Sequence, residues 1–398
     1  MRLSGLPCVS AASCATTSIC RWSMGRATSW GRASRPLAAI SVSSRAAGCS
    51  CTWWSASSSS ACCSPTSCSC NRDWRMDFIQ ANLLTLILFT PTLAAGITLL
   101  IPRERTQAIR WFATLASLVP LGLSLWMWFD YQPGLPGFQF EQRLVWYEAI
   151  NASYHLGVDG ISTPMVLLTT LLTPLALLIS WNIQDRVRSY MALFLLLETG
   201  MLGVFLSLDL FLFFVFWEIG LVPMYFLINQ WGSEIGFRQV ARRQVPARNY
   251  ASFKFLIYTM AGSLGLLLGI QLMGVTADGF DIPHIIRVWP SIQEPLTLFG
   301  LPIAVPIGTV KAVAFWAFVI AFAIKVPVWP FHTWLPDAHT EAPTAGSMIL
   351  AGVLLKLGAY GFLRFVLPLF PVPAHNFAPV LAVLAMLAIV FGALSSFA

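Results

Sequence analysis

Charged residues are scarce in this chain. Only 10% of its 398 residues are Asp, Glu, Lys or Arg, whereas 57% are hydrophobic. Soluble domains carry about 25% charged residues, so this chain has too few of them to cover a surface that faces water. The composition excludes an ordinary soluble globular protein and indicates that a lipid bilayer is the solvent.

Cysteine is absent from Met76 onward, and all nine cysteines lie in the first 75 residues. The chain from Met76 on therefore has no thiolate with which to ligate an iron–sulfur cluster. The nine cysteines stand irregularly in Ser-, Ala-, Arg- and Trp-rich sequence, which matches no zinc site, disulfide framework or targeting peptide. We interpret residues 1–75 as a low-complexity extension, disordered or mistranslated, and expect the true start at Met76.

The net charge of +7 does not indicate nucleic-acid binding. Residues 1–75 carry eight arginines and a single acid, Asp73, and this difference accounts for the whole excess. From Met76 on, the chain has 16 basic and 16 acidic residues. No phosphate-cradling glycine loop, Ser-His-Asp arrangement or nucleophile elbow occurs in it. We therefore expect no nucleic-acid partner and no cofactor site in this chain.

The sequence contains many long apolar segments. A helix needs about 20 apolar residues to cross the hydrocarbon core. Residues 76–398 are predicted to form an all-α polytopic transmembrane domain of about nine spans, at 78–101, 107–129, 158–181, 189–207, 208–230, 252–274, 311–331, 343–366 and 377–398. The last run is still apolar at Ala398, so we expect the sequence to stop within a helix bundle.

The connections between these spans alternate in charge. Arginines follow the first, third and fifth spans: Arg103, Arg105 and Arg110, then Arg186 and Arg188, then Arg238, Arg242, Arg243 and Arg248. Acids follow the second, fourth and sixth spans: Asp130, Glu141 and Glu148, then Asp209, then Asp278, Asp281 and Glu294. The positive-inside rule therefore predicts that Met76 starts on the outer side and that segment 332–342 is a cytoplasmic loop.

Three ionisable residues are predicted to lie near the bilayer centre: Glu218, Lys325 and Lys356. Each sits well inside its span, and Lys325 is about 21 Å from the start of its helix. Such residues are expensive in a membrane and are functional candidates by default. Pro327 and Pro330 should break the helix just past Lys325, as in transporters that bind ions at mid-membrane. The alternative is a structural ion pair that only holds helices together.

Other candidates are weaker. Glu198 is also within a span. It is either an accessory group in a proton relay through Glu218, Lys325 and Lys356 or a buried hydrogen-bonded residue. Lys254 lies near the cytoplasmic end of its helix, where its ammonium could simply snorkel to the interface. His332 and His339 flank Asp337, but their spacing matches no standard metal site, so we expect a hydrated turn that feeds protons and no metal.

The glycine series Gly262, Gly265 and Gly269 predicts close packing of its helix against another. Three further histidines, His155, His284 and His375, are assigned to loops and given no function.

Three segments together carry a resemblance to a known family. They read LGVDGISTPMVLLTTLLTPLALLIS, FLFFVFWEIGLVPMYFLI and FAIKVPVWPFHTWLPDAHTEAPTAGSMILAGVLLKLGAYGFLRF. From Met76 to Ala398 the chain resembles the antiporter-like, proton-pumping membrane subunits of respiratory complex I, the NADH–quinone oxidoreductase, and among them the chain M (subunit 4) family. The WLPDAH run is shared by the wider antiporter-like family.

The resemblance implies a bundle with two inverted five-helix repeats, of which this sequence holds the first and only the start of the second. It implies that Glu218 is the mid-membrane glutamate, that Lys325 is the lysine of the broken helix and that Lys356 passes protons sideways. His332 matches a histidine beside the break. Flavin, iron–sulfur clusters and quinone are expected in partner subunits, namely the other membrane subunits of complex I with their neighbouring antiporter-like chains.

The sequence thus predicts a proton-translocating subunit in a bacterial inner membrane, with no redox site of its own. Redox chemistry in the partners would switch Glu218 and Lys325 between paired and separated states, which shifts the proton affinity of Lys325. Two alternatives stay open. The chain is a subunit of a multi-subunit cation/proton antiporter or membrane-bound hydrogenase, or it is a structural membrane scaffold with inert buried ion pairs.

Overall fold

The computed structural model describes residues 79–397, apart from 234–235, 241–242, 294–295 and 298–303. The extension 1–75 and Met76, on which two of our predictions fall, lie outside the described residues. Within the described part, nine helical segments are long and apolar enough to cross a membrane. They correspond one to one with the nine predicted spans, so the prediction of an all-α integral membrane fold is confirmed.

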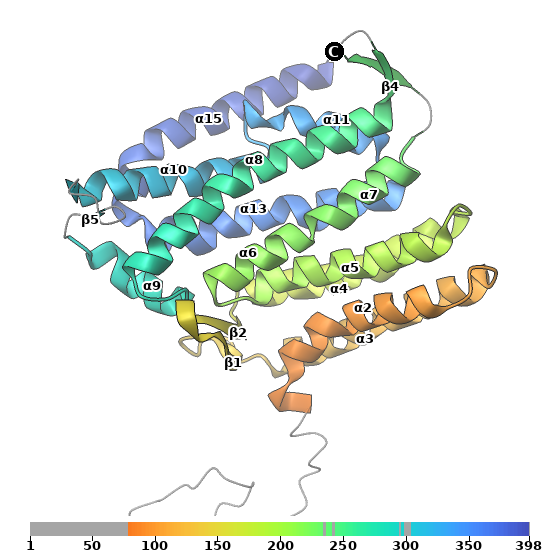
Figure 1. Ribbon diagram of the computed structural model, residues 1–398, viewed down its shortest axis with the longest axis horizontal. Coiled ribbons are helices and arrows are strands. Elements are labelled where there is room, and N and C mark those ends of the chain that lie inside the picture. The colour runs from red at the N-terminus through yellow and green to blue at the C-terminus, as the bar shows by residue number, and fades with distance from the viewer. Residues whose placement is uncertain (1–78, 234–235, 241–242, 294–295, 298–303, 398) are drawn as a thin grey trace, which may run out of the picture. The chain divides into compact units, whose positions relative to one another are not determined.

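The spans lie side by side in one bundle (Figure 1). Six are continuous helices or end in a short turn: α2 (Leu83–Leu100), α3 (Thr106–Asp130), α4 (Ser162–Ile179), α5 (Val187–Leu206), α8 (Ala247–Thr276) and α15 (Pro371–Phe397). The other three are interrupted: α6 (Leu210–Ile219) with α7 (Leu221–Trp231), α10 (Ile307–Lys325), and the run from α12 (Thr344–Ile349) through α13 (Leu355–Gly361) to α14 (Leu367–Leu369). The inverted repeat stays a prediction.

Helix α5 forms the centre of the bundle, and its glycines allow neighbours to approach closely. A Cβ on Gly200 would lie 2.6 Å from the backbone nitrogen of Gly220, and one on Gly203 would lie 2.1 Å from Cγ of Phe216. Both distances are below van der Waals contact. Only glycine therefore lets the span α6–α7 pack this tightly against α5.

The outward faces of the bundle are apolar. Leu100, Phe129 and Val275 are 83%, 82% and 79% exposed, and in water such contiguous surface would promote aggregation. In a bilayer the same side chains meet acyl chains at no cost. The exposed apolar surface therefore agrees with the membrane solvent that the composition indicated.

The glycine series of α8 packs against α10, as predicted. A Cβ on Gly262 would approach Cδ1 of Ile324 to 2.9 Å and Cα of Ala321 to 3.2 Å. One on Gly269 would approach the Phe318 ring to the same 2.9 Å, whereas one on Gly265 would meet only ordinary contacts at 3.8 Å or more. The two helices therefore touch most closely at the outer members of the series.

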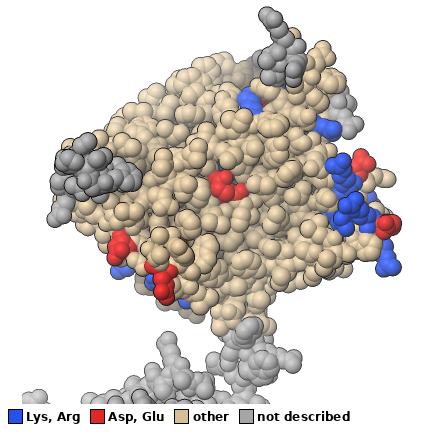
Figure 2. All heavy atoms as spheres, viewed as in Figure 1, with Lys and Arg blue, Asp and Glu red and all other residues tan. Residues whose placement is uncertain are grey.

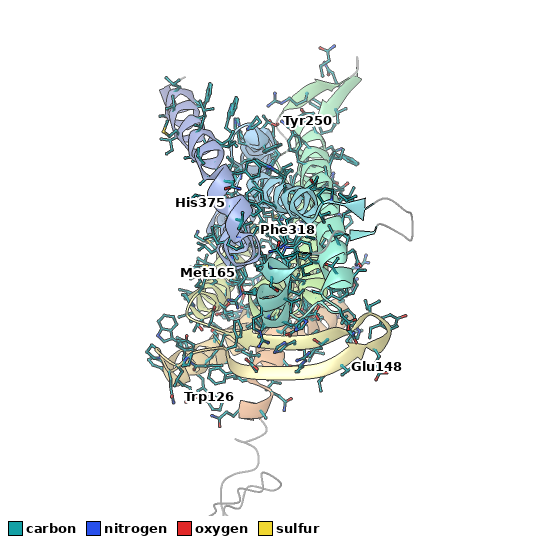
Figure 3. All side chains as sticks on the ribbon, turned by 90° about the vertical axis from the view of Figure 1, so that its left-hand side faces the viewer. Trp126, Glu148, Met165, Tyr250, Phe318 and His375 are labelled. Carbon is teal, nitrogen blue, oxygen red and sulfur yellow. The ribbon has the colours of Figure 1, made fainter. Side chains whose placement is uncertain are left out.

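Three two-stranded antiparallel sheets connect the spans in the described residues, and the sequence analysis predicted none of them. They are β1 (Gln139–Tyr147) with β2 (Ala152–Val158), β3 (Phe237–Val240) with β4 (Arg243–Pro246), and β5 (Leu296–Thr297) with β6 (Ala304–Val305). In the first, β2 is largely buried whereas β1 is largely exposed, so neither strand shows clear alternation. Figure 3 shows this hairpin along one end of the bundle, with Glu148 near its tip.

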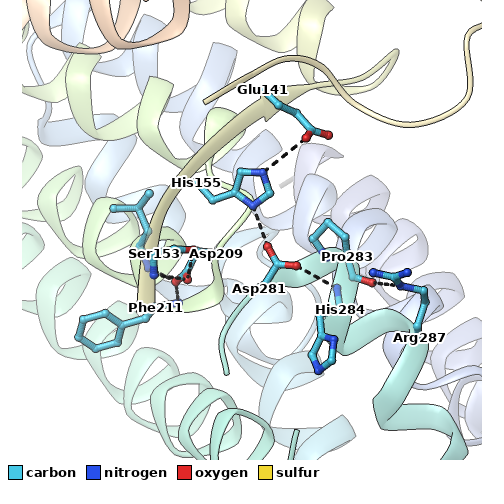
Figure 4. Close-up of polar contacts among 10 residues, drawn as sticks. Glu141, Ser153, His155, Asp209, Phe211, Asp281, Pro283, His284 and Arg287 are labelled. Carbon is cyan, nitrogen blue, oxygen red and sulfur yellow. Dashed lines mark hydrogen bonds and ion pairs between the residues drawn. The ribbon is translucent and has the colours of Figure 1, made fainter. Parts of the chain in front are cut away.

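A polar cluster fixes the β1–β2 hairpin to the bundle (Figure 4). Asp209 is fully buried, accepts from the backbone N–H of Ser153 at 2.9 Å, and caps α6 by accepting from the N–H groups of Phe211 and Leu212. His155 Nδ1 lies 2.7 Å from Asp281 Oδ1. We call Glu141, Ser153, His155, Asp209 and Asp281 the end cluster; it joins β2 to the starts of α6 and α9 (Ile282–Val288).

The two ends of the bundle differ in charge. Figure 2 shows basic side chains gathered at the end where the α2–α3 and α4–α5 connections lie, and mainly acidic ones at the end of the β1–β2 hairpin. The wide apolar face between them carries an acidic patch near mid-height. This polarity is the one that the alternating loop charges predicted.

We expect Gly262→Ala to destabilise the protein by about 1 to 3 kcal/mol, because the added methyl overpacks the α8–α10 contact. Gly265→Ala, the same change one turn along the helix, should be neutral. Thermal unfolding of the purified protein in detergent, followed by tryptophan fluorescence, checks this. Equal effects of the two substitutions would contradict the packing described here.

The end cluster generates a prediction on pH dependence. Burial acts to raise the pKa of the Asp281 carboxyl, but the hydrogen bond and charge of His155, the charge of Arg143 and the His284 N–H outweigh it and lower the pKa. A carboxyl with a lowered pKa stabilises the fold at neutral pH, and this contribution is lost as the pH falls through the folded-state value, below about 4.

Asp281→Asn should therefore destabilise the protein by about 2 kcal/mol at neutral pH, and the difference from the unaltered protein should shrink as the pH falls below about 4. The same fluorescence-detected unfolding, repeated across pH, measures it. A penalty that does not change with pH would show that the charge of Asp281 plays no part. Glu148→Gln, at the exposed tip of the hairpin, is the control.

Candidate functional site

The seventh span is broken where the sequence predicted. Helix α10 ends at Lys325, residues 326–330 are not helical, and the chain continues through a short turn, Phe331–Thr333, into α11 (Trp334–Glu341). Proline has no backbone N–H, so Pro327 and Pro330 cannot continue the hydrogen-bonding pattern of α10. At the break, the carbonyl of Ala323 accepts from the N–H of Val328 at 2.9 Å, a contact outside the regular helical pattern.

The prediction that 332–342 is a loop was wrong, because residues 334–341 form helix α11. Pro336 stands in the first turn of this helix, where a missing N–H is tolerated. Trp334 anchors the helix: its side chain is 1% exposed, its Nε1 donates to the carbonyl of Ile324 at 2.9 Å, and its ring packs on Phe255 of α8. The aromatic contact to a distant helix was not visible in the sequence.

Lys325 is buried among aromatic rings at the break. Its side chain is 3% exposed, and Nζ lies 5.1 Å from the ring centre of Trp217 and 6.0 Å from that of Phe255. Ring faces attract cations and lower the cost of desolvating the ammonium. Among the described residues, no carboxylate oxygen lies within 4.0 Å of Nζ.

Glu218 lies next to Trp217 and faces the same region. It precedes the junction of α6 and α7 at Gly220, where Pro223 deprives the Ile219 carbonyl of its helical donor. Its Oε1 is buried with no hydrogen-bond partner among the described residues. The charge of the Glu218 carboxylate acts on Lys325. The structure thus brings Glu218 and Lys325 together without joining them in a tight ion pair.

Glu198 lies in the most buried part of α5. Its side chain is 0% exposed, and neither carboxylate oxygen has a hydrogen-bond partner among the described residues. Gly200 and Gly220, which follow Glu198 and Glu218 by two residues, pack against each other. Because α5 and α6 run in opposite directions, the two glutamates lie on opposite sides of this contact, about 6 Å apart along the helix axes. A carboxyl group in this setting needs hydration or neutralisation.

Lys356 points away from this group. It lies on α13 and is exposed, and Nζ donates to the carbonyls of Gly352 at 2.8 Å and Ala351 at 3.3 Å. These carbonyls belong to a π-helical segment, Leu350–Leu354. The helix itself is near Lys325, since a Cβ on Gly358 would lie 3.0 Å from Cβ of Lys325. The backbones are adjacent, while the two ammonium groups face different surroundings.

Lys254 is paired on the side of the break that leads to α11. Its Nζ lies 2.7 Å from Asp337 Oδ2, and Asp337 Oδ1 also accepts from Arg238 Nη2 at 3.0 Å. His332 lies in the turn between Lys325 and α11, and its Nδ1 is buried with no hydrogen-bond partner among the described residues. Lys254, Asp337 and His332 therefore extend the polar side chains from Lys325 toward the basic end of the bundle.

Sequence reasoning missed two polar partners of this site. Asp337 was considered only as a metal ligand, although it is the partner of Lys254.

The second pair is Asp159 with Arg364. Arg364 is 8% exposed, and its guanidinium contacts Asp159 Oδ2 and lies 4.6 Å over the Phe138 ring. Burial acts to raise the pKa of Asp159, but Arg364 and Ser162 outweigh it and lower the pKa. Both pairs join residues far apart in sequence, so no local pattern could have revealed them.

Within the described residues, no three His, Cys, Asp or Glu side chains gather in a way that could hold a metal ion. The chemistry that the arrangement offers is proton exchange among carboxyl, amine and imidazole groups. Glu218, Lys325, Glu198 and His332 are the groups placed for it.

Comparison with known proteins identifies the relatives of this architecture. Residues 207–398 match the family described as NADH:quinone oxidoreductase/Mrp antiporter, TM. Residues 137–209 match the amino terminus of NADH-ubiquinone oxidoreductase chain 4. Together the two matches take in the hairpin β1–β2, the broken span and every candidate proton-carrying residue named above.

The chain is 41% identical over 323 residues to NADH-quinone oxidoreductase subunit M of Rhodobacter capsulatus, covering 80% of this chain and 59% of that protein. It is 43% identical over 306 residues to the subunit M of Pseudomonas aeruginosa, covering 73% and 55%. The chain thus spans a little over half the length of these relatives.

Among solved structures, respiratory complex I from Thermus thermophilus with bound NADH contains a chain that matches with a TM-score of 0.61 and 26% identity, over 76% of this chain and 57% of that one. A chain of the Mrp complex from Dietzia matches with a TM-score of 0.58 and 25% identity, over 74% and 29%. With nine spans among its described residues, a broken helix and two adjoining family matches, the chain belongs to the subunit M (chain 4) family of NADH-quinone oxidoreductase.

Proposed function

We propose that this chain is the proton-translocating membrane subunit of an NADH-quinone oxidoreductase, in which redox chemistry in partner subunits drives proton movement. The observation that carries the proposal is Lys325, a buried ammonium at a helix break, with Glu218 nearby and no tight ion pair. In a purely structural pair, the ammonium and the carboxylate would be in hydrogen-bonding contact, because breaking or loosening a buried pair costs several kcal/mol. A proton carrier instead needs a partner that can approach and withdraw.

In the proposed mechanism, a charge change transmitted from the partner subunits moves Glu218 relative to Lys325. Removing or restoring the nearby carboxylate changes the proton affinity of the amine. Lys325 then exchanges its proton through water, receiving it from the side of His332 and Lys254 and passing it toward Lys356. Glu198, on the neighbouring helix, is an accessory site along the same path.

The redox groups belong to other subunits in this proposal. Flavin, iron–sulfur clusters and quinone reside in the partners, and the neighbouring antiporter-like subunits adjoin this chain in the membrane. The chain would act as part of a translocase without a redox centre of its own. The lack of cysteine from Met76 on supports this division.

Two other functions compete. A subunit of a cation/proton antiporter would share the broken helix, but the Mrp match is 25% identical, whereas the subunit M relatives are 41% and 43% identical. A structural scaffold would give no reason for the buried carboxyl group of Glu198, which has no hydrogen-bond partner among the described residues. Both observations favour the oxidoreductase subunit.

We further propose that the basic end of the bundle faces the cytoplasm and that the protein resides in a bacterial inner membrane. Arg103, Arg186 and Arg238 lie in connections at one end and Arg188 lies in the first turn of α5 beside them, as the positive-inside rule requires. The end cluster then faces the outer side.

The test is NADH-driven acidification of inverted membrane vesicles that carry the unaltered chain or Glu218→Gln. We expect at least a tenfold loss of acidification in Glu218→Gln, since the neutral side chain keeps its volume but can no longer change the proton affinity of Lys325. Glu148→Gln, the same change at an exposed position, should pump normally.

Assembly and NADH oxidation are measured on the same membranes. Normal acidification by an assembled Glu218→Gln complex would overturn the relay. Cation exchange that needs no NADH would favour the antiporter instead.

The pairing of Lys254 gives a second test in the same vesicles. Asp337→Asn should reduce acidification severalfold, because it leaves Lys254 without its carboxylate and loosens α11 next to the break. Arg238→Gln removes the other partner of Asp337. The Arg238 side chain is 61% exposed, and exposed pairs contribute about 0 to 1 kcal/mol. This substitution should therefore have little effect. Equal losses in both variants would show that the contact with Lys254 has no special role.

A further inference from the structure

A polar hollow lies at the basic end of the bundle, away from the candidate relay. It encloses about 640 Å³ and is lined by residues that include Arg103, Thr106, Arg186, Arg188, Ser189 and Gln230. Three of its lining residues are arginines, and none is acidic. The residues come from the α2–α3 connection, the start of α5 and the end of α7. The hollow therefore sits between the ends of several spans.

The arginines of this hollow are not neutralised by the protein. Arg186 Nη1 donates to Gln230 Oε1 at 3.2 Å, and Arg188 Nη1 donates to the carbonyl of Leu99 at 3.1 Å. Both acceptors are uncharged. Among the described residues, no carboxylate oxygen lies within 4.0 Å of any of the three guanidinium groups. Glu104 and Asp185 are sequence neighbours, but they do not line the hollow.

The N-terminus of α5 opens into the same hollow. Its first three residues, Val187, Arg188 and Ser189, all line it, and no side chain caps this helix. The first N–H groups of a helix have no acceptor within the helix and carry the positive end of its dipole. Uncapped N–H groups beside three arginines form a binding site for an anion, phosphate above all.

The surroundings place this site at the membrane surface. Trp111 and Trp181 contact each other with ring centres 5.1 Å apart, and Arg110 lies 5.9 Å over the Trp181 ring. Tryptophans of this kind mark the level of lipid headgroups. Beside the hollow, where Arg188 donates to the carbonyl of Leu99, Leu99, Leu100 and Trp111 are 48%, 83% and 56% exposed and present an apolar wall on which an acyl chain can lie.

We propose that this hollow binds the phosphate headgroup of an anionic phospholipid. The three arginines and the α5 N-terminus bind the phosphodiester, while the hydroxyls and amides of Thr106, Ser189 and Gln230 accept or donate to its polar ester groups. A lipid fits better than a free anion, because headgroup-level tryptophans and an exposed apolar wall adjoin the charge. Basic pockets between the ends of membrane helices are suited to such headgroups.

The test compares two single substitutions in one loop. Arg103 lines the hollow and Arg105 does not, so Arg103→Gln and Arg105→Gln remove the same charge from neighbouring positions. The assembled membrane complex is placed in nanodiscs of phosphatidylcholine with a minority of phosphatidylglycerol, and the phosphatidylglycerol retained after transfer to detergent is counted by native mass spectrometry. Other lipid sites of the complex contribute equally to both variants.

We expect the unaltered complex and Arg105→Gln to retain the same excess of phosphatidylglycerol. Arg103→Gln should weaken binding at this site by about fivefold, the effect of one basic residue near an anionic headgroup. Arg186→Gln combined with Arg188→Gln should remove the excess. Equal retention in Arg103→Gln and Arg105→Gln would overturn the proposal. Displacement of the lipid by millimolar inorganic phosphate would overturn it too, in favour of a free-anion site.

Discussion

The bilayer interior allows a charge only where the protein compensates for it. The burial of the Lys325 ammonium is therefore the constraint on which the helices packed around it depend. This ammonium lies on aromatic faces from α6 and α8 and at the end of an interrupted helix. Beyond the interruption the chain continues into a second, shorter helix, α11. That piece is held to α8 by Trp334 and Asp337. The broken span, the aromatic packing and the ion pair of α11 all follow from placing one charge at this depth.

The described charges are satisfied differently at the ends and in the middle of the bundle. At the ends they form close pairs, His155 with Asp281, Lys254 with Asp337, and Arg364 with Asp159. In the middle, Glu198 has no protein partner and Glu218 is only partly satisfied. Close pairs hold the ends in one arrangement. Groups that lack fixed partners can instead change protonation with little rearrangement, which is what the proposed function requires.

Close helix packing makes this arrangement geometrically feasible. Gly200 allows α5 to touch the α6–α7 junction, and Gly358 allows α13 to touch the end of α10. The first contact brings together the helices that carry Glu198 and Glu218. The second brings the helix that carries Lys356 up to Lys325. Glycines at the crossings therefore set the distances between the charged groups, although they have no chemistry themselves.

The sequence by itself determined the number of spans, the charge difference between the two ends, the break after Lys325 and the candidates Glu218 and Lys325. These features depend on local composition: about 20 apolar residues make a span, and proline removes a backbone donor wherever it stands. Only the tertiary structure decided which charges meet. Asp337 pairs with Lys254 across 83 residues, and Arg364 with Asp159 across 205. It also decided that Lys356 faces outward, that 334–341 is a helix and that three arginines share a hollow, because each depends on contacts between distant segments that no local pattern encodes.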